Sequence, residues 1–335
     1  MSDGRLRWGV LGVAHIATAK VIPAMQKGRF CSVDAIASRE KGKAQGAALA
    51  LGIPRAYGSY EELLADPKID AIYNPLPNHL HVPWSLRALE AGKHVLCEKP
   101  IALTVAEAEE LREAARRSGK RVQEAFMVRT HPQWLGAREL VRSGRIGPLR
   151  AVSSFFGYFN EDAANVRNVA AFGGGGLMDI GCYPITVSRF LFEAEPRRVM
   201  GLIERDPRFG TDRLASALLD FGSGQAAFTC STQAVPYQCV QIMGTTGRIE
   251  VEIPFNAPND RPCRLLVDDG RDVFGSGVEV QTFDTCDQYT VQGDRFAQAI
   301  LDDAPPPVPI DDAVDNMRVI EAVFRSTESG LWEAP

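Results

Sequence analysis

The alternation of strand and helix patterns over residues 6–126 restricts the fold of this chain more than any other feature. Within it, Ser59 with Glu62 and Thr104 with Glu107 have the spacing of a capping box, which predicts two helix starts. Strands that alternate with helices of this length predict βαβ units and a doubly wound parallel sheet. The predicted strands cover 6–12, 32–38, 69–76, 94–97 and 120–126, and the predicted helices cover 14–27, 40–51, 59–66, 80–91 and 104–119.

The pattern changes after about residue 126. Strand-like segments separated by glycine-containing turns then dominate, which predicts an α+β domain with an open, mostly antiparallel sheet. A proline-rich linker at 302–310 precedes a predicted closing helix at 311–329. Because 335 residues exceed one typical core, we expect an N-terminal domain at 1–125 and a C-terminal domain at 126–335.

Composition narrows the classes of function. The net charge is −5 and the basic residues are scattered, so we expect no binding to nucleic acid. No apolar run reaches the ~18 residues of a membrane span, and the opening MSDGRLRW lacks the apolar core of an export signal. Seven dispersed cysteines form no CxxC pair, which indicates free thiols. We therefore expect a cytoplasmic protein.

The stretch GVLGVAHIA follows the first predicted strand and opens a helix, which is the context of a dinucleotide-binding turn. In the pattern G-x-G-x-x-G/A, Gly12 makes the tight turn, Ala14 takes the middle position and Ala17 allows close packing of helix on strand. A plain strand–helix turn built from small residues is the alternative. Together with the βαβ pattern, the turn predicts an N-terminal Rossmann domain.

The end of the second predicted strand indicates which dinucleotide is bound. An acidic residue there would accept a hydrogen bond from the ribose 2′-hydroxyl of NAD. This chain has Ser38 and Arg39 instead, with Lys43 one helical turn later. A hydroxyl and two cations suit a 2′-phosphate, so we predict NADP(H). The alternative is that Arg39 is simply solvated.

In an open α/β sheet, ligands bind beyond the carboxyl ends of the strands. Three polar segments follow predicted strands there: NPLPNHLH (74–81), CEKP (97–100) and EAFMVRTHP (124–132). With WGVLGVAHIA, AGKHVLCEKP and GGGGLMDIGCYPI (173–185), they make the chain resemble the glucose–fructose oxidoreductase / inositol dehydrogenase / MocA family of NAD(P)-dependent oxidoreductases. The resemblance implies a Rossmann domain and an open-faced sheet domain with the active site between them.

The resemblance also implies roles for individual residues. Lys99 of the EKP motif would lie by the nicotinamide and bond the reacting oxygen, Glu98 would lie near the nicotinamide ribose, and the peptide bond before Pro100 would be cis. Asp179 and Tyr183 fall on the D-x-G-x-[HY] positions, with tyrosine as in the sugar-oxidoreductase and dihydrodiol-dehydrogenase-like branches. The predicted cofactor-binding residues are Gly12, Ala14, His15, Ile16, Ser38, Arg39, Lys43, Leu76, Pro77, Asn78, His81, Glu98 and Lys99.

The chemistry can also be argued from the residues themselves. Transfer of a hydride from an alcohol needs a proton acceptor and a group that stabilises the alkoxide. A tyrosine has a pKa near ~10, and a nearby ammonium lowers it, so Tyr183 could act as acid/base with Lys99 as its electrostatic partner. Asp179, four residues before Tyr183, would orient a substrate hydroxyl. Further predicted substrate contacts are Arg129, Asn165 and Arg167.

Each of these residues also has a structural alternative. A strand-ending lysine is usually solvated, Tyr183 could be packing, and Asp179 could be only a helix-start residue. His79 and His81 have no third ligand cluster in the sequence, so we predict no metal site. We expect a structural role for His131.

We predict an NADP-dependent oxidoreductase that interconverts an alcohol and a carbonyl on a sugar or polyol. The alternatives are a trans-dihydrodiol dehydrogenase or ketose reductase of the same branch, a non-catalytic NADP-binding regulator and an NAD-dependent glycosidase. The open sheet predicts a homodimer or homotetramer formed through its uncovered face.

Overall fold

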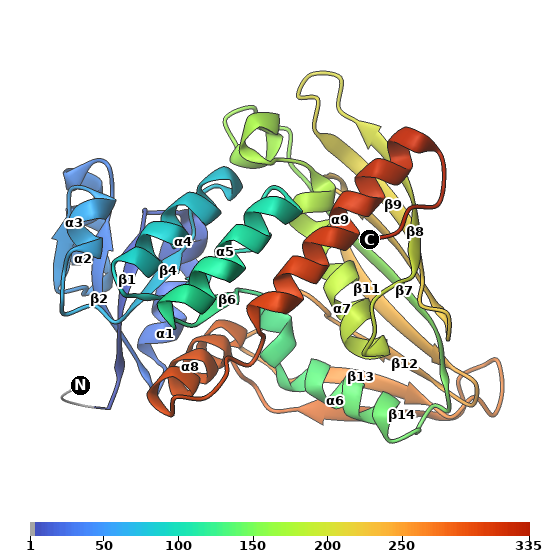
Figure 1. The fold of residues 1–335 in the computed structure, drawn as a ribbon. Coiled ribbons are helices and arrows are strands. Elements are labelled where there is room, and N and C mark those ends of the chain that lie inside the picture. Colours follow the sequence, from blue (N-terminus) through green and yellow to red (C-terminus); the bar gives the residue numbers. More distant parts are fainter. Residues whose placement is uncertain (1–3) are drawn as a thin grey trace. The chain divides into compact units, whose positions relative to one another are not determined.

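The computed structural model describes residues 4–335. The chain divides into two compact units (Figure 1). The first contains the chain up to Met127 together with Asp287–Val314, and the second contains Val128–Cys286 and Asp315–Pro335. The single boundary predicted near residue 126 does not include this return of the chain to the first unit. The return depends on tertiary packing, which local patterns do not report.

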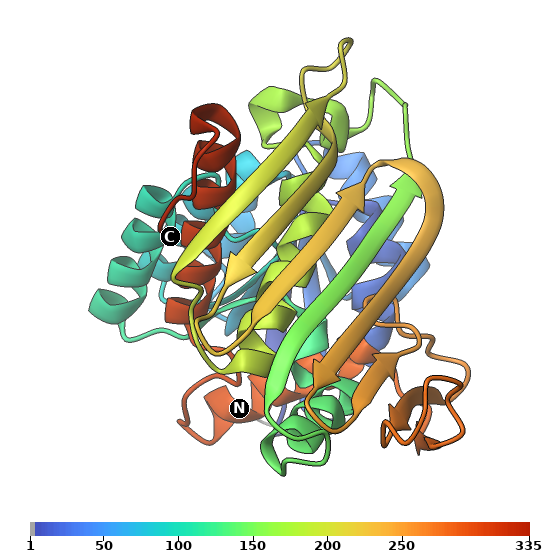
Figure 2. The same ribbon diagram turned by 90° about the vertical axis from the view of Figure 1, so that its right-hand side faces the viewer.

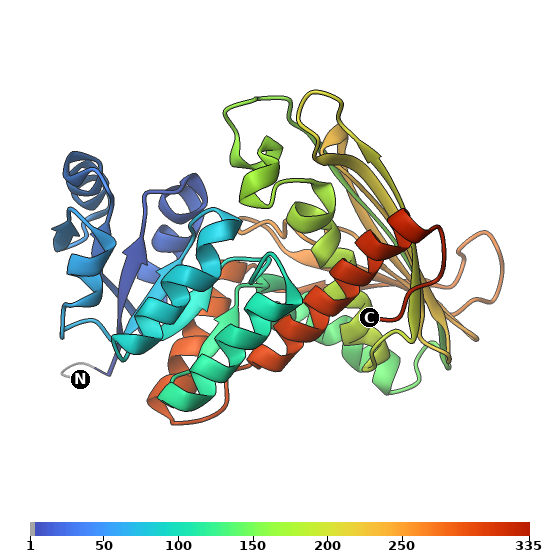
Figure 3. The same ribbon diagram turned by 45° about the horizontal axis from the view of Figure 1, so that its top comes forward.

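The first unit contains a parallel sheet, as predicted. Its six strands have the order β3-β2-β1-β4-β5-β6, and β3 was not among the predicted strands. The order reverses between β1 and β4, so right-handed crossovers place the helices before and after that point on opposite faces. Figures 1 and 3 show α4 and α5 lying side by side. The strands are β1 (Leu6–Leu11), β2 (Cys31–Ala37), β3 (Arg55–Tyr57), β4 (Ala71–Asn74), β5 (His94–Cys97) and β6 (Val122–Glu124).

Two helices of the first unit begin where the capping boxes predict. Ser59 accepts from the Glu62 N–H (3.1 Å) and Thr104 from the Glu107 N–H (3.2 Å), which confirms both predicted helix starts. A π-helical turn, Ala17–Val21, precedes the first helix. The helices are α1 (Ile22–Gln26), α2 (Lys41–Leu51), α3 (Tyr60–Leu64), α4 (His81–Glu90), α5 (Val105–Ser118) and α8 (Gln288–Leu301).

Packing of α8 explains why residues 287–314 return to the first unit. The Phe296 ring lies 5.8 Å from the ring of Trp8 on β1, and both side chains are fully buried. The Asp294 carboxylate accepts hydrogen bonds from the backbone N–H groups of Arg29 (2.8 Å) and Phe30 (2.9 Å), just before β2. Helix α8 therefore completes the core beneath β1 and β2.

The second unit contains an eight-stranded sheet with the order β14-β13-β12-β11-β7-β10-β9-β8, and only the β7–β10 pair is parallel. This confirms the predicted open, mostly antiparallel sheet. Its strands are β7 (Leu149–Phe159), β8 (Arg198–Arg205), β9 (Asp212–Asp220), β10 (Gln225–Ser231), β11 (Gln233–Gly244), β12 (Arg248–Val251), β13 (Cys263–Asp268) and β14 (Val278–Phe283).

Helices pack on one face of this second sheet. They are α6 (Pro132–Arg142), α7 (Cys182–Phe192) and the part of α9 (Ile310–Ser329) from Asp315 onward, since this helix starts in the first unit. Among the described residues of this unit, no helix covers the other face (Figure 2). Nor does the chain over residues 4–335 contain a helix with the length and apolar content that crossing a membrane requires.

Candidate functional site

The predicted dinucleotide turn lies between β1 and the π-helical turn of the first unit. Gly12 has φ +85°, and an added Cβ there would lie 3.0 Å from the Leu76 side chain, so conformation and space both favour glycine. Ala17 is fully buried, as its packing role predicts. Ala14 and Ile16 are half-buried and His15 is exposed at the start of the helical segment, where backbone N–H groups attract anions. The geometry suits a pyrophosphate.

The end of β2 brings three predicted residues close together. Ser38 is buried and its hydroxyl accepts from the Glu40 N–H (3.2 Å), while Arg39 is exposed. Lys43 is exposed and its ammonium lies 2.6 Å from the Glu40 carboxylate, a pair the sequence analysis did not consider. Arg39 therefore carries the less compensated positive charge at this position.

Tyr60, at the start of α3, is a residue of this edge that the sequence analysis missed. Its hydroxyl lies 3.5 Å from the position of an added Cβ at Gly12, and its ring packs edge-on against Trp84. Burial raises the pKa of Tyr60, and the nearby Arg39 guanidinium opposes that rise. The capping pattern predicted only that Tyr60 lies in the first turn of a helix. It gave no indication that this residue lies beside the glycine turn.

The loop after β4 supplies the next predicted residues. Leu76 is buried, with its side chain next to Gly12, while Pro77 and Asn78 are half-buried. His81 is 1% exposed, and its two ring nitrogens each lie 2.7 Å from a backbone oxygen, of Leu76 and of Pro100. Both nitrogens are thus occupied by the protein. We therefore replace the predicted direct cofactor contact of His81 with a role in holding the loops.

Glu98 and Lys99 follow β5 at the same carboxyl edge of the sheet, and both are half-buried. The Glu98 carboxylate accepts a hydrogen bond from the hydroxyl of Tyr73 (2.7 Å), a fully buried residue of β4. The Lys99–Pro100 peptide bond is cis, as the resemblance implied. The carboxyl edge of the sheet therefore presents a lysine and an oriented carboxylate after β5, and a glycine turn after β1.

In the second unit, Asp179 lies in the π-helical turn Leu177–Gly181 that leads into α7. Its Oδ2 accepts hydrogen bonds from the Tyr158 hydroxyl (2.6 Å) and the Arg167 Nε (3.0 Å). The Asp179 carboxylate raises the pKa of Arg167, and burial raises that of Tyr158. Sequence analysis missed Tyr158, because its contact with Asp179 depends on how the end of β7 faces the turn before α7.

Tyr183 lies on the first turn of α7 and is 6% exposed. Its ring packs against the rings of Phe156 (5.7 Å) and Phe255 (5.4 Å), which hold it in place. Residues 177–192 are helical, and their first turn, Leu177–Gly181, is π-helical. Asp179 and Tyr183 are therefore separated by about one turn of the same helical segment.

The glycine run before Asp179 packs against protein groups. An added Cβ at Gly174 would collide with the Arg167 carbonyl, and one at Gly175, where φ is +120°, with the Asp212 carboxylate. Asp212 is buried and its Oδ2 accepts from the Leu177 N–H (2.5 Å), at the start of the segment that carries Asp179. The absence of side chains at these glycines lets the loop reach Asp212.

The remaining predicted substrate residues have structural contacts in the second unit. Asn165 accepts from the Arg167 N–H (3.1 Å) and starts the short turn that carries Arg167. The Arg129 guanidinium lies over the ring of Phe190 (4.6 Å) and donates to Thr186 (3.3 Å) on α7. Contacts of these residues with a substrate stay predictions.

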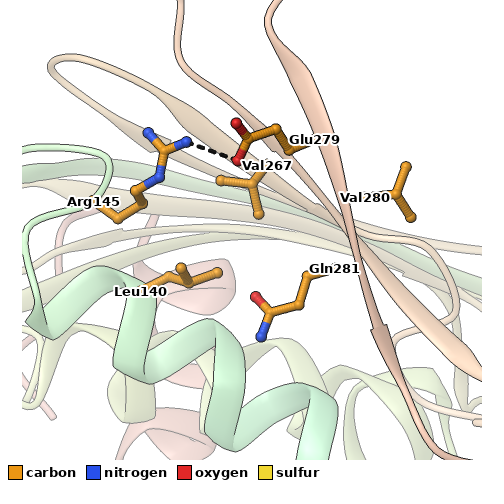
Figure 4. A pocket seen from close by; sticks show the side chains of 6 residues that line it. All are labelled: Leu140, Arg145, Val267, Glu279, Val280 and Gln281. Atoms are coloured by element: carbon orange, nitrogen blue, oxygen red, sulfur yellow. Dashed lines mark hydrogen bonds and ion pairs between the residues drawn. The ribbon is translucent and has the colours of Figure 1, made fainter.

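A cavity of about 310 Å³ lies beside α6 and the edge strand β14 (Figure 4). None of its lining residues belongs to the predicted site, and the Arg145 guanidinium is paired there with Glu279 (3.1 Å). We assign it no function. The cavity is lined by Leu140, Arg145, Val267, Glu279, Val280 and Gln281.

Comparison with protein families decides the assignment. Residues 6–126 match the GFO/IDH/MocA oxidoreductase family with an NAD-binding Rossmann fold, and residues 134–250 match the C-terminal domain of the same family. The chain belongs to this family. It is therefore an oxidoreductase, and the resemblance seen in its motifs is confirmed.

Relatives and solved structures agree with this assignment. An uncharacterised oxidoreductase of Rhizobium meliloti is 46% identical over 98% of each chain. D-xylose 1-dehydrogenase (NADP(+)) 2 of Haloferax volcanii is 38% identical over 97% of this chain and 98% of its own. The crystal structure of aldose-aldose oxidoreductase from Caulobacter crescentus, complexed with glycerol, has a TM-score of 0.90 at 28% identity and covers 99% and 100% of the two chains.

Proposed function

We propose that this oxidoreductase uses NADP(H) to interconvert an alcohol and a carbonyl on a sugar or polyol, as an aldose dehydrogenase or reductase. The observation that carries the cofactor choice is the exposed Arg39 beside Ser38 at the end of β2, where an NAD enzyme would carry an acidic residue. The xylose dehydrogenase relative, whose name includes NADP(+), supports the same choice.

The residues of the first unit fit a bound dinucleotide. Gly12 makes the tight turn before a helical segment whose first N–H groups would bind the pyrophosphate, and Ser38 and Arg39 would offer a hydroxyl and a guanidinium to the 2′-phosphate. When bound, the nicotinamide ring supplies the hydride acceptor or donor. Glu98, held by the Tyr73 hydroxyl, would accept hydrogen bonds from the nicotinamide ribose.

The catalytic roles follow from what each residue offers. Lys99 would bond the reacting oxygen and stabilise its negative charge, and Tyr183 would take up or return the proton. Asp179 would accept a hydrogen bond from another substrate hydroxyl. Because Tyr158 and Arg167 donate to the same Asp179 oxygen, they hold that carboxylate in one orientation.

The test is an NADP⁺ reduction screen over aldoses, polyols and trans-diols. We expect turnover with some aldoses. A trans-diol preference would instead favour the second candidate, which the 32% identical trans-1,2-dihydrobenzene-1,2-diol dehydrogenase of Mus musculus supports. Tight NADPH binding without turnover on any alcohol or carbonyl would favour a non-catalytic regulator.

We further propose that the enzyme is cytoplasmic and forms a homodimer or homotetramer through the uncovered sheet face. Leu202 is 75% exposed and Tyr237 is 58% exposed, and Leu218 on β9 is 45% exposed. Large apolar side chains exposed on an uncovered sheet face are suited to contact with a second copy of the chain.

A further inference from the structure

The peptide group between Pro100 and Ile101, directly after Lys99, is held from both sides by buried polar side chains. Its carbonyl oxygen lies 2.7 Å from the Nδ1 of His81, and its N–H donates to the Oε1 of Glu124 (2.7 Å). Both His81 and Glu124 are 1% exposed. Burial of two such groups is costly unless they are bonded, so their convergence on one peptide group indicates a specific task.

The two side chains come from different elements that are themselves fixed. His81 starts α4, and its own carbonyl accepts from the Nδ2 of the fully buried Asn74 (3.0 Å). The Asn74 carbonyl in turn accepts from the Glu98 N–H (3.0 Å). Glu124 ends β6 directly beside Cys97 of β5. The loops after β4, β5 and β6 are thus tied together around Lys99.

We propose that His81 and Glu124 are positioning residues for Lys99. By hydrogen-bonding the next peptide group from opposite sides, they fix the backbone at Lys99. This inference rests on the proposed catalytic role of Lys99. A displacement of about 1 Å in a reacting group can lower a rate by about 10²-fold. Loss of the hydrogen bonds that fix the adjoining backbone should therefore have a measurable effect on turnover.

The hydrogen bond to Pro100 requires a particular protonation of the His81 ring, because Nδ1 must carry a proton to donate to the Pro100 oxygen. Burial lowers the pKa of His81 to about 4, the two backbone oxygens oppose that effect, and the charges of Lys99 and His79 add to it. A neutral ring satisfies one of its two carbonyl neighbours and a cationic ring satisfies both. In either form, the hydrogen bond to the Pro100 oxygen requires the proton on Nδ1.

Kinetics of matched variants test the positioning role. Glu124→Met removes the acceptor for the Ile101 N–H, and Glu124→Gln keeps an acceptor of similar shape. We expect Glu124→Met and His81→Leu each to lower kcat by about 10²-fold, with KM and the NADPH Kd, followed by protein fluorescence, within about threefold of wild type. Glu124→Gln should restore kcat to within about fivefold of wild type.

His94→Leu is the matched control. This half-buried histidine begins β5 at the opposite end of the strand, and its ring accepts from the Arg121 N–H (2.9 Å). It should lower the melting temperature without a selective loss of kcat. Wild-type kcat in Glu124→Met, no rescue by Glu124→Gln, or an equal kcat loss in His94→Leu would overturn the proposal.

The closing experiment needs no substrate and uses one variant, His81→Gln, only to assign a signal. In ¹⁵N-histidine-labelled wild-type enzyme, long-range ¹H–¹⁵N spectra report which ring nitrogens are protonated, and loss of one spin system in His81→Gln assigns His81. A protonated Nδ1 near pH ~7.5 supports the positioning role of His81, and an unprotonated Nδ1 overturns the proposal. Absence of sugar turnover would refute the proposed function and leave this result standing.

Discussion

Replacement of Arg39 by aspartate should reverse the preference for NADP(H) over NAD(H). A charge-assisted hydrogen bond to phosphate contributes about 1.5–3 kcal/mol. A carboxylate about 4 Å from the phosphate adds about 1 kcal/mol of repulsion at the water-exposed position of Arg39. The total of about 2.5–4 kcal/mol corresponds to a loss on the order of 10²–10³ in relative NADP affinity, because about 1.4 kcal/mol is tenfold.

The assay is the Kd of NADPH and of NADH, measured by quenching of protein fluorescence at about 0.1 M salt, where screening is comparable between variants. Arg117→Asp is the matched control, because Arg117 is an exposed arginine in the last turn of α5, at the opposite edge of the parallel sheet. We expect no change in its NADPH/NADH ratio. A ratio within threefold of wild type in Arg39→Asp would refute the cofactor assignment.

Three further predictions follow from charges and surfaces. Lys43→Met should weaken NADPH binding by only about threefold, since the Lys43 ammonium is already paired with Glu40 at 2.6 Å, and a loss as large as that of Arg39→Asp would contradict this. Burial raises the pKa of Asp212 from 3.8 to about 6, so the folded state binds this proton more tightly than the unfolded chain. The contribution of Asp212 to the free energy of unfolding is then full below about pH 4 and is lost as the pH rises through about 6, by at most about 3 kcal/mol. Urea unfolding at several pH values should show this fall in the wild type and not in Asp212→Asn. Leu218→Glu should convert an oligomer to a 36.6 kDa monomer in light scattering, and a monomeric wild type would contradict the proposed interface.

The sequence predicted both sheets because their signals are local. Alternating strand and helix patterns, capping boxes and glycine turns each report on a few neighbouring residues, and together they specify a parallel sheet followed by an antiparallel one. The position of Lys99 at a carboxyl edge followed from the strand before it. The return of α8 to the first unit did not, because the contact of Phe296 with Trp8 joins residues that no local pattern connects.

The partners of the site residues were the least predictable part. Tyr60 comes beside Gly12, and Tyr158 bonds Asp179, only through the packing of separate elements. The role of His81 also needed the structure, since its sequence position alone suggested a ligand contact, whereas its ring is enclosed between two backbone carbonyls.

The most direct test of the central claim is the rate of NADP⁺ reduction by the best aldose of the screen, compared between wild type, Lys99→Met and the exposed-lysine control Lys68→Met. Removal of a group that stabilises the reacting oxygen should lower kcat by about 10²–10³-fold, with the NADPH Kd within about threefold of wild type. The control should keep wild-type kcat. A Lys99→Met enzyme that turns over at the wild-type rate would contradict the account.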